Sequence, residues 1–173
     1  MRRPRLRPEI RLTEVPGPAR IAPYCVAFEG EVELGAELAS GRFVALHDPI
    51  GQETWQGDFR VVTLTRATLD PEMASEALLG EVAWSWVCEL LTEAEVPAHN
   101  VGGTVTRVLS SSHGTLSERP DVVDLEIRAS WTPGDLNLGE HLRLWTDLMA
   151  TAAGLPPLPD GVTALSRSRI GVR

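Results

Sequence analysis

Residues 121–131, DVVDLEIRASW, alternate between apolar and polar side chains more cleanly than any other stretch of the chain. One side of an extended chain would carry Val123, Leu125, Ile127, Ala129 and Trp131, and the other Asp124, Glu126, Arg128 and Ser130. Successive side chains of a β-strand point to opposite faces of its sheet. The stretch therefore predicts a strand with one face buried and the other in water.

Other stretches of the same kind extend this sheet. The expected strands are residues 26–34, 38–47, 58–69, 104–109 and 121–131, with a candidate short strand at 10–15. Gly102-Gly103 opens one of them, and Asp48-Pro49-Ile50-Gly51 matches a type I turn, with Asp first, Pro second and Gly fourth. Because the links between strands are short, antiparallel pairing is favoured.

Two helices complete the predicted fold. Asp70-Pro71 is typical of a helix cap and first helical position, and this helix is expected to run to about residue 95, with a break or kink near Gly80. The second helix is expected over residues 138–153, ended by Gly154. The order β-β-β-(β)-α-β-β-α predicts a two-layer α+β sandwich, a mostly antiparallel sheet of five or six strands with two helices on one face.

Trp84 and Trp86 lie two residues apart on the first helix, so their rings point about 200° apart and cannot share one face. Trp86 falls within the apolar stripe of that helix, and we assign it to the core together with Trp131 and Trp145.

The remaining tryptophans are the best candidates for contact with a partner. Trp84 falls at the margin of the helix stripe near Cys88, and Trp55 lies in the loop after the expected turn. Either ring closes the edge of the core or anchors a partner or a second copy, since tryptophan is enriched among interface hot spots. We name Trp84, Trp55 and Cys88 as the candidate interaction residues.

Length and charge bound the organisation of the chain. Its 173 residues fit one domain, which we place at residues 10–155. A basic tail at 1–9 is expected to be disordered, and a Pro/Arg/Ser-rich tail at 156–173 to be loosely ordered. The net charge is −8, and five of the 16 arginines fall in the first eleven residues, so the body of the domain would repel a phosphate backbone.

The apolar stretches and the cysteines of the chain indicate its compartment. The chain contains no run of 18 apolar residues, so no membrane insertion is expected. No apolar stretch follows the N-terminal arginines, so they do not form a secretory signal. Cys25 and Cys88 are therefore expected to be reduced thiols in the cytoplasm.

Candidate catalytic and metal-binding groups are few. His47 and Asp48 are neighbours on an expected strand and point to opposite faces, and the four histidines have no recognisable ligand spacing. Neither cysteine has an activating base nearby in the sequence. We therefore expect no catalytic residue, no cofactor and no metal site.

A row of carboxylates, Glu29, Glu31 and Glu33, shares one face of an expected strand. Such a row binds a cation or a basic peptide, or it is simply a solvated sheet face. We favour the solvated face, balanced by Arg42, Arg60 or Arg66 on neighbouring strands.

Four segments together carry a family resemblance: LHDPIGQETWQGDFRVVTLTRATLDPEM (46–73), EVAWSWVCELL (81–91), GGTVTR (102–107) and EIRASWTP (126–133). With them the chain resembles, from about residue 7 to 165, an actinobacterial family of uncharacterised proteins, domain-of-unknown-function family 3000. Members of that family usually begin with an additional amphipathic helix, and this chain starts just after the point where that helix would end. With that helix restored, the element order is similar to the type III secretion-chaperone-like fold of small acidic dimeric binding proteins.

Three hypotheses on function follow. The first is a cytoplasmic, non-enzymatic protein-binding or chaperone-like module that forms a homodimer. The second is a small enzyme whose pocket collects His47, Arg42 and Glu53. The third is weak nucleic-acid binding through the N-terminal arginines, which would depend steeply on salt.

Overall fold

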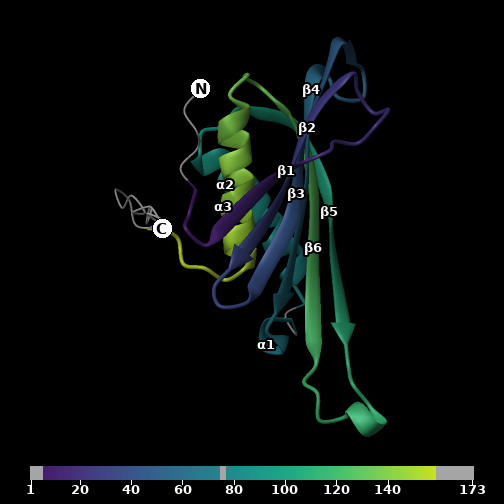
Figure 1. The fold of residues 1–173 in the computed structure, drawn as a ribbon, viewed down its shortest axis with the longest axis vertical. Helices are drawn as coiled ribbons and strands as arrows, with labels where there is room; N and C mark the ends of the chain where they lie inside the picture. The colour runs from purple at the N-terminus through teal and green to yellow at the C-terminus, as the bar shows by residue number, and fades with distance from the viewer. Residues whose placement is uncertain (1–5, 75–76, 159–173) are drawn as a thin grey trace, which may run out of the picture.

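The computed structural model describes residues 6–74 and 77–158, and within them one antiparallel sheet carries its two long helices on one face (Figure 1). The sheet has six strands in the order β1-β2-β3-β4-β6-β5. The elements are β1 (Ile10–Val15), β2 (Tyr24–Glu33), β3 (Glu37–Gln52), β4 (Gly57–Leu69), α1 (Pro71–Ala74), α2 (Leu79–Glu93), β5 (Ala98–Ser110), η1 (Gly114–Leu116), β6 (Val122–Pro133) and α3 (Leu138–Ala152). The predicted α+β class and element order are confirmed, including the candidate short strand at β1.

Strand β6, from the stretch with the clearest alternation, lies inside the sheet between β4 and β5. Its apolar side faces the helices, where Leu125 and Ile127 are each 1% exposed and Trp131 is 0% exposed. Truncation of Leu125 to Ala would cost about 2–5 kcal/mol of folding free energy because the vacated space cannot fully collapse.

The turn predicted at Asp48–Gly51 is wrong, because β3 continues to Gln52 and the chain turns over residues 53–56. The register between β3 and β4 shifts after His47, so this end of β3 is irregular. The Asp48 carboxylate accepts hydrogen bonds from the backbone N–H of Ile50 (3.2 Å) and from Nε2 of Gln52 (3.1 Å). Those bonds satisfy the Asp side chain locally without closing the predicted turn.

Strand β5 begins at Ala98, six residues before the predicted start at residue 104. A register shift between His99 and Gly102 marks a bulge opposite β6. The Asn100 side-chain amide donates to the backbone carbonyls of Thr54 (3.0 Å) and Trp55 (3.2 Å), which ties the bulge to the β3–β4 turn. These contacts are made by residues about 45 positions away, so local sequence did not reveal the strand.

The first predicted helix is divided. Its cap is confirmed, because the Asp70 carboxylate accepts a hydrogen bond from the backbone N–H of Glu72 (3.0 Å) at the start of α1. Helix α2 then begins at Leu79, so the break falls just before Gly80.

Trp145 on α3 packs closely on the sheet because two neighbouring strands both carry a glycine beneath its ring. Gly30 and Gly41 pair across β2 and β3 under this ring. A Cβ at Gly30 would lie 2.8 Å from Cη2 of Trp145, and one at Gly41 would lie 3.0 Å from its Cζ2. The indole N–H is shared between the Leu64 carbonyl and the Thr65 hydroxyl, each at 3.2 Å. A fully buried tryptophan thus keeps its polar atom satisfied.

Trp84 and Trp86 lie on either side of the buried stripe of α2, and neither is central to it. That stripe consists of Leu79, Ala83, Val87 and Leu91. The small Ala83 and Val87 face the sheet, and both tryptophans are half-buried beside them. Trp86, which we assigned to the core, does pack against it, but its ring is only half-buried and lies at the core edge, beside the groove between α2 and α3. The predictions for Trp131 and Trp145 are confirmed.

The described ends of the chain meet beside the helices. Arg7, within the predicted N-terminal tail, has a side chain only 9% exposed, and its Nη2 donates to the backbone carbonyl of Pro156 at 2.6 Å. Residues 1–5 and 159–173, which hold most of both predicted tails, lie outside the described residues. In the part of the chain that the structure describes, no helix combines the length and apolar character needed to cross a bilayer.

Candidate interaction surface

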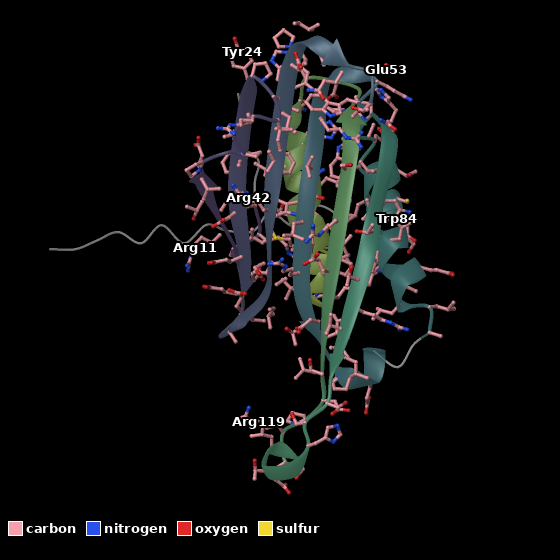
Figure 2. The ribbon with its side chains drawn as sticks, turned by 90° about the vertical axis from the view of Figure 1, so that its right-hand side faces the viewer. Arg11, Tyr24, Arg42, Glu53, Trp84 and Arg119 are labelled. Atoms are coloured by element: carbon pink, nitrogen blue, oxygen red, sulfur yellow. The ribbon has the colours of Figure 1, made fainter. Side chains whose placement is uncertain are left out.

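The sheet face opposite α2 and α3 carries no helix from the described residues, and we call it the open face. Figure 2 looks onto it and shows Arg11 and Arg42 among its side chains, with Trp84 at the β5 margin. Side chains at alternate positions of all six strands project from this face, as the pleat of a sheet requires. It gathers polar groups from several strands on one surface.

One end of the open face has a small hydrophobic cluster of its own. Trp55 is 8% exposed and packs there against Ala27, Val44 and Leu46. The ring is therefore buried within the chain, on the side of the sheet away from the main core.

The three candidate interaction residues do not lie together. Trp84 belongs to the helix layer, where its ring lies over Gly103 of β5 so closely that a Cβ there would come within 2.7 Å of Cζ3. Cys88 follows one helical turn later and is exposed. Trp55 lies on the other face of the sheet. Partner contact at Trp84 and Cys88 stays a prediction.

The residues of the predicted enzyme pocket do not converge either. The ring of His47 stacks between Phe59 and Tyr24, with ring centroids 4.1 and 5.8 Å away. Arg42 lies on the open face, where its Nη2 donates to the Pro16 carbonyl at 2.7 Å, and Glu53 is exposed in the β3–β4 turn. His47 and Arg42 are five residues apart on one strand, so they point to opposite faces.

The centre of the open face holds a charged triad that the sequence did not predict, Arg66–Glu126–Arg128. Arg66 on β4 pairs directly with Glu126 on β6, and Arg128 follows Glu126 by two residues on the same face. Arg66 donates through Nε to Oε2 of Glu126 at 2.8 Å, and Arg128 donates through Nε to Oε1 at 2.6 Å. These two hydrogen bonds hold the pKa of Glu126 below its usual range, with a further contribution from the two positive charges.

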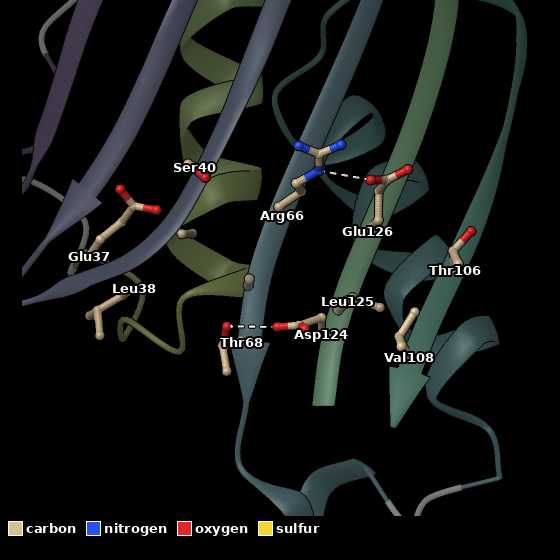
Figure 3. A pocket seen from close by; sticks show the side chains of 12 residues that line it. Glu37, Leu38, Ser40, Arg66, Thr68, Thr106, Val108, Asp124, Leu125 and Glu126 are labelled. Atoms are coloured by element: carbon tan, nitrogen blue, oxygen red, sulfur yellow. Dashed lines mark hydrogen bonds and ion pairs between the residues drawn. The ribbon is translucent and has the colours of Figure 1, made fainter. Parts of the chain in front are cut away.

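Both arginines of the triad keep their outer nitrogens available. Each guanidinium contacts Glu126 through its Nε atom. Within the described residues, no acceptor is found for the Nη atoms of either arginine. Figure 3 shows the dashed contact to Glu126 starting from the inner nitrogen of Arg66, with no dashed line at its two terminal nitrogens. The two side chains are 58% and 63% exposed. The triad therefore presents two positioned guanidinium forks to solvent.

The triad separates two hollows of the open face. The middle hollow, of about 400 Å³, has Val44, Val62 and Leu64 in its lining and Arg42 and Arg128 at its sides. The lower hollow, also about 400 Å³, includes Arg66 and Glu126 and is more polar (Figure 3). Thr68 donates to the Asp124 carboxylate there at 2.9 Å.

Arg60 lies on the open face above the middle hollow and is bound only to neutral acceptors among the described residues. Its Nη1 donates to the Asn100 carbonyl (2.8 Å) and the Thr132 hydroxyl (3.1 Å), and its Nη2 donates to the Ser130 hydroxyl (2.7 Å). Partial burial lowers the pKa of Arg60, yet a guanidinium stays charged at any physiological pH. Arg60 both holds the β5 bulge in place and adds a positive charge to this face.

The row of carboxylates on β2 is balanced by arginines, although only partly by those expected. Arg42 lies 3.7 Å from Glu29, as predicted. Glu31 and Glu33 are paired instead by Arg11 of β1, at 3.5 and 3.0 Å. Arg60 and Arg66 point to other partners.

A third hollow, of about 600 Å³, lies between α2 and α3 beside Trp86. Arg143 donates to Asp147 at 2.8 Å inside it. Burial raises the pKa of Asp147, and the charges of Arg143 and Arg7 oppose that shift. Across residues 6–74 and 77–158, the structure brings together no group of three potential metal ligands.

A family profile described as "Protein of unknown function (DUF3000)" matches residues 1–163 of this chain. The chain belongs to the DUF3000 family. No curated protein and no solved structure matches it. The family description supplies no activity, so the function of this DUF3000 chain has to be argued from its own geometry.

Part of the triad of this DUF3000 chain could be predicted from the sequence. The alternation over residues 121–131 already placed Glu126 and Arg128 together on the polar side of β6. The missing information was the register, because only the pairing of β4 with β6 sets Arg66 opposite Glu126.

Proposed function

We propose that this DUF3000 chain is a non-enzymatic protein-binding module that holds its partner on the open face. The observation that carries the proposal is the middle hollow, where Val62 is 40% exposed and Leu64 half-buried between arginines. Apolar side chains beside guanidinium groups are typical of interface centres, in which arginine is enriched. Arg42 and His47, in contrast, project from opposite faces of β3, which does not favour a pocket that collects both.

Self-association is the second part of the proposal. Strand β5 is an outer strand of the sheet, and its 13 residues contain no proline, a residue that commonly blocks an edge. Val108 and Leu109 near its end are 51% and 65% exposed. We infer that a second copy pairs along β5, which would satisfy the outer backbone groups of both strands. A cytoplasmic, chaperone-like role belongs to the same proposal and is supported by the acidic charge and the element order.

The test of partner binding uses two valines of nearly equal exposure. Val62 on the open face is 40% exposed, and Val82 on α2 is 43% exposed. Tagged wild-type, Val62→Glu and Val82→Glu proteins are used to capture partners from the native organism, followed by mass spectrometry. We expect Val62→Glu to lose partners that Val82→Glu keeps. Retention of every partner by Val62→Glu would remove the open face as the docking site.

Sedimentation tests the dimer. The Val108→Lys/Leu109→Lys double variant places charges on the β5 edge, and Leu136→Lys, at a site 74% exposed in the β6–α3 loop, is the control. We expect a dimer for the wild type and the control and a monomer for the double variant. A monomeric wild type at every concentration tested would contradict the self-association proposal without affecting the open face.

A further inference from the structure

We propose that the open face recognises an acidic segment of its partner, in extended conformation, with carboxylates at alternate positions bound by Arg66 and Arg128. An apolar side chain further along the same segment would pack on Val62 and Leu64. This inference rests on the proposed function, because it names the chemistry of the partner that the open face would hold.

The local charge opposes that of the whole chain. The net charge is −8, yet the residues that line the middle hollow include Arg42 and Arg128 and no carboxylate, and Arg60 lies above that hollow. Arg66 lines the lower hollow, together with the carboxylates Glu37, Asp124 and Glu126. Glu29 lies at the β2 side, next to Arg42. An acidic protein that concentrates arginines at one uncovered place attracts carboxylates there and repels them elsewhere.

The triad prepares its arginines for such a ligand. Glu126 fixes Arg66 and Arg128 through their Nε atoms, which reduces the side-chain freedom that binding would otherwise remove. The Nη pair of each guanidinium then matches the two oxygens of an incoming carboxylate. A lysine in the same position would offer a point charge without this geometry.

The spacing of the forks matches an extended chain. Arg66 and Arg128 are diagonal neighbours across β4 and β6, a relationship that separates Cα atoms by roughly 7–8 Å. Side chains on one face of an extended segment repeat at roughly 6.6–6.8 Å. Acidic residues at positions i and i+2 therefore meet the two forks, whereas residues at i and i+1 point in opposite directions.

The apolar floor sets the third position. Leu64 pairs with Arg128 across the sheet, and Val62 precedes Leu64 by two residues on the same face. An apolar residue at i+4 of the bound segment would reach this floor. Contact with a nucleic acid is less well matched, because the residues lining the two hollows include no aromatic ring on which a base would stack.

Two peptides of equal composition and charge test the inference, Glu-Ser-Glu-Ser-Leu and Glu-Glu-Ser-Ser-Leu, both with blocked ends. Amide chemical shifts of the full chain are followed up to about 10 mM peptide, which detects millimolar Kd values. We expect the alternating peptide to bind more tightly, to shift signals of β4 and β6, and to weaken from about 50 mM to about 500 mM NaCl.

Substitutions identify the arginines responsible. Arg66→Gln and Arg128→Gln should each weaken the alternating peptide by about two- to fivefold, the range expected for an exposed charge pair. Arg11→Gln is the matched control, because Arg11 lies on the same face but outside the triad. Thermal unfolding of each variant confirms that the fold is kept.

Three outcomes overturn the inference: no shift at the highest peptide concentration, equal binding of the two peptides, or stronger shifts of the same signals by a short oligothymidine. Partner capture distinguishes failure of this inference from failure of the proposed function. If captured partners depend on Val62 but not on Arg66, Arg128 or salt, the open face still binds proteins and only the acidic chemistry is wrong. If they depend on none of these, both proposals fall.

Discussion

The indole N–H of Trp131 on β6 donates a 2.9 Å hydrogen bond to Nδ1 of His141 on α3, and both residues are 0% exposed. An acceptor role for Nδ1 places the proton of the neutral ring on Nε2. That atom lies 3.5 Å from Oδ1 of Asp135, a long contact. Burial lowers the pKa of His141, and the charges of Asp135 and Glu140 oppose the shift. The sheet and the last helix are therefore joined through a neutral histidine.

Stability should consequently fall in acid because of His141. The folded state has the lower histidine pKa, so its contribution is complete above the unfolded value of about 6.5. As the pH falls below that value, the unfolded state binds the proton first, and stability declines until the folded-state pKa is passed. Urea unfolding between pH 7.5 and pH 5 measures this slope.

Replacement of His141 by Phe separates charge from packing. The variant should lose the pH dependence in this range and become less stable by about 1–3 kcal/mol at neutral pH, because the Trp131 N–H would have no acceptor. An unchanged pH slope in His141→Phe would assign the effect to other groups.

The glycine pair beneath Trp145 gives a second prediction. Gly41→Val should destabilise the fold by at least about 1–3 kcal/mol, because a Cβ there would clash with the Leu64 carbonyl and press on the indole ring. Gly80→Ala on α2 is the control, since no atom lies within 4 Å of a Cβ at that site. That change should stabilise by up to about 1 kcal/mol through helix propensity. Equal Tm values for the two variants would contradict the close packing.

The triad predicts an unusually acidic glutamate. Carbon-detected NMR titration should show Glu126 losing its proton below the usual glutamate pKa of about 4.3, and Arg66→Gln should move that value upward. Because the folded-state pKa is the lower one, the stabilisation is present above about 4.3 and is lost as the pH falls through the folded value. The expected loss is under about 1 kcal/mol, because both arginines are well exposed.

Arg60 should matter for the order of the β5 bulge more than for the sheet as a whole. Arg60→Leu removes its hydrogen bonds to Asn100, Thr132 and Ser130, and we expect amide hydrogen exchange to rise over residues 98–102. Exchange in β2 and β3 near Gly30 should stay unchanged. Protection kept at residues 98–102 would show that Asn100 alone holds the bulge.

The parts of the fold that followed from sequence are those set by local periodicity. The alternation in β6, the Asp70 cap and the extent of α3 depend on residues within one element, and each is confirmed. The early start of β5 and the place of Trp86 depend instead on distant contacts. Periodicity could not show that Ala83 and Val87 would face the sheet and leave a tryptophan on each side.

The site was harder to predict than the fold for a related reason. Residues on one face of a strand are known from the pattern, but their neighbours on adjacent strands depend on register. The glutamates of β2 were expected to be balanced by Arg42, Arg60 or Arg66, and of these three Arg42 lies beside the row, at Glu29. The meeting of Arg66 with Glu126 required the three-dimensional pairing of β4 and β6.

Glu126 divides its two oxygens between a guanidinium facing the lower hollow and another facing the middle one. An anion on the Nη atoms of Arg128 would weaken the hold of that guanidinium on Glu126 and leave the carboxylate more to Arg66, in a lower hollow that Glu37 and Asp124 also line. The anion affinities of the two hollows are therefore not independent. By thermodynamic linkage, filling one hollow would change the affinity of the other by the same factor in both directions, so the shared carboxylate predicts that the two hollows respond to anions as a coupled pair.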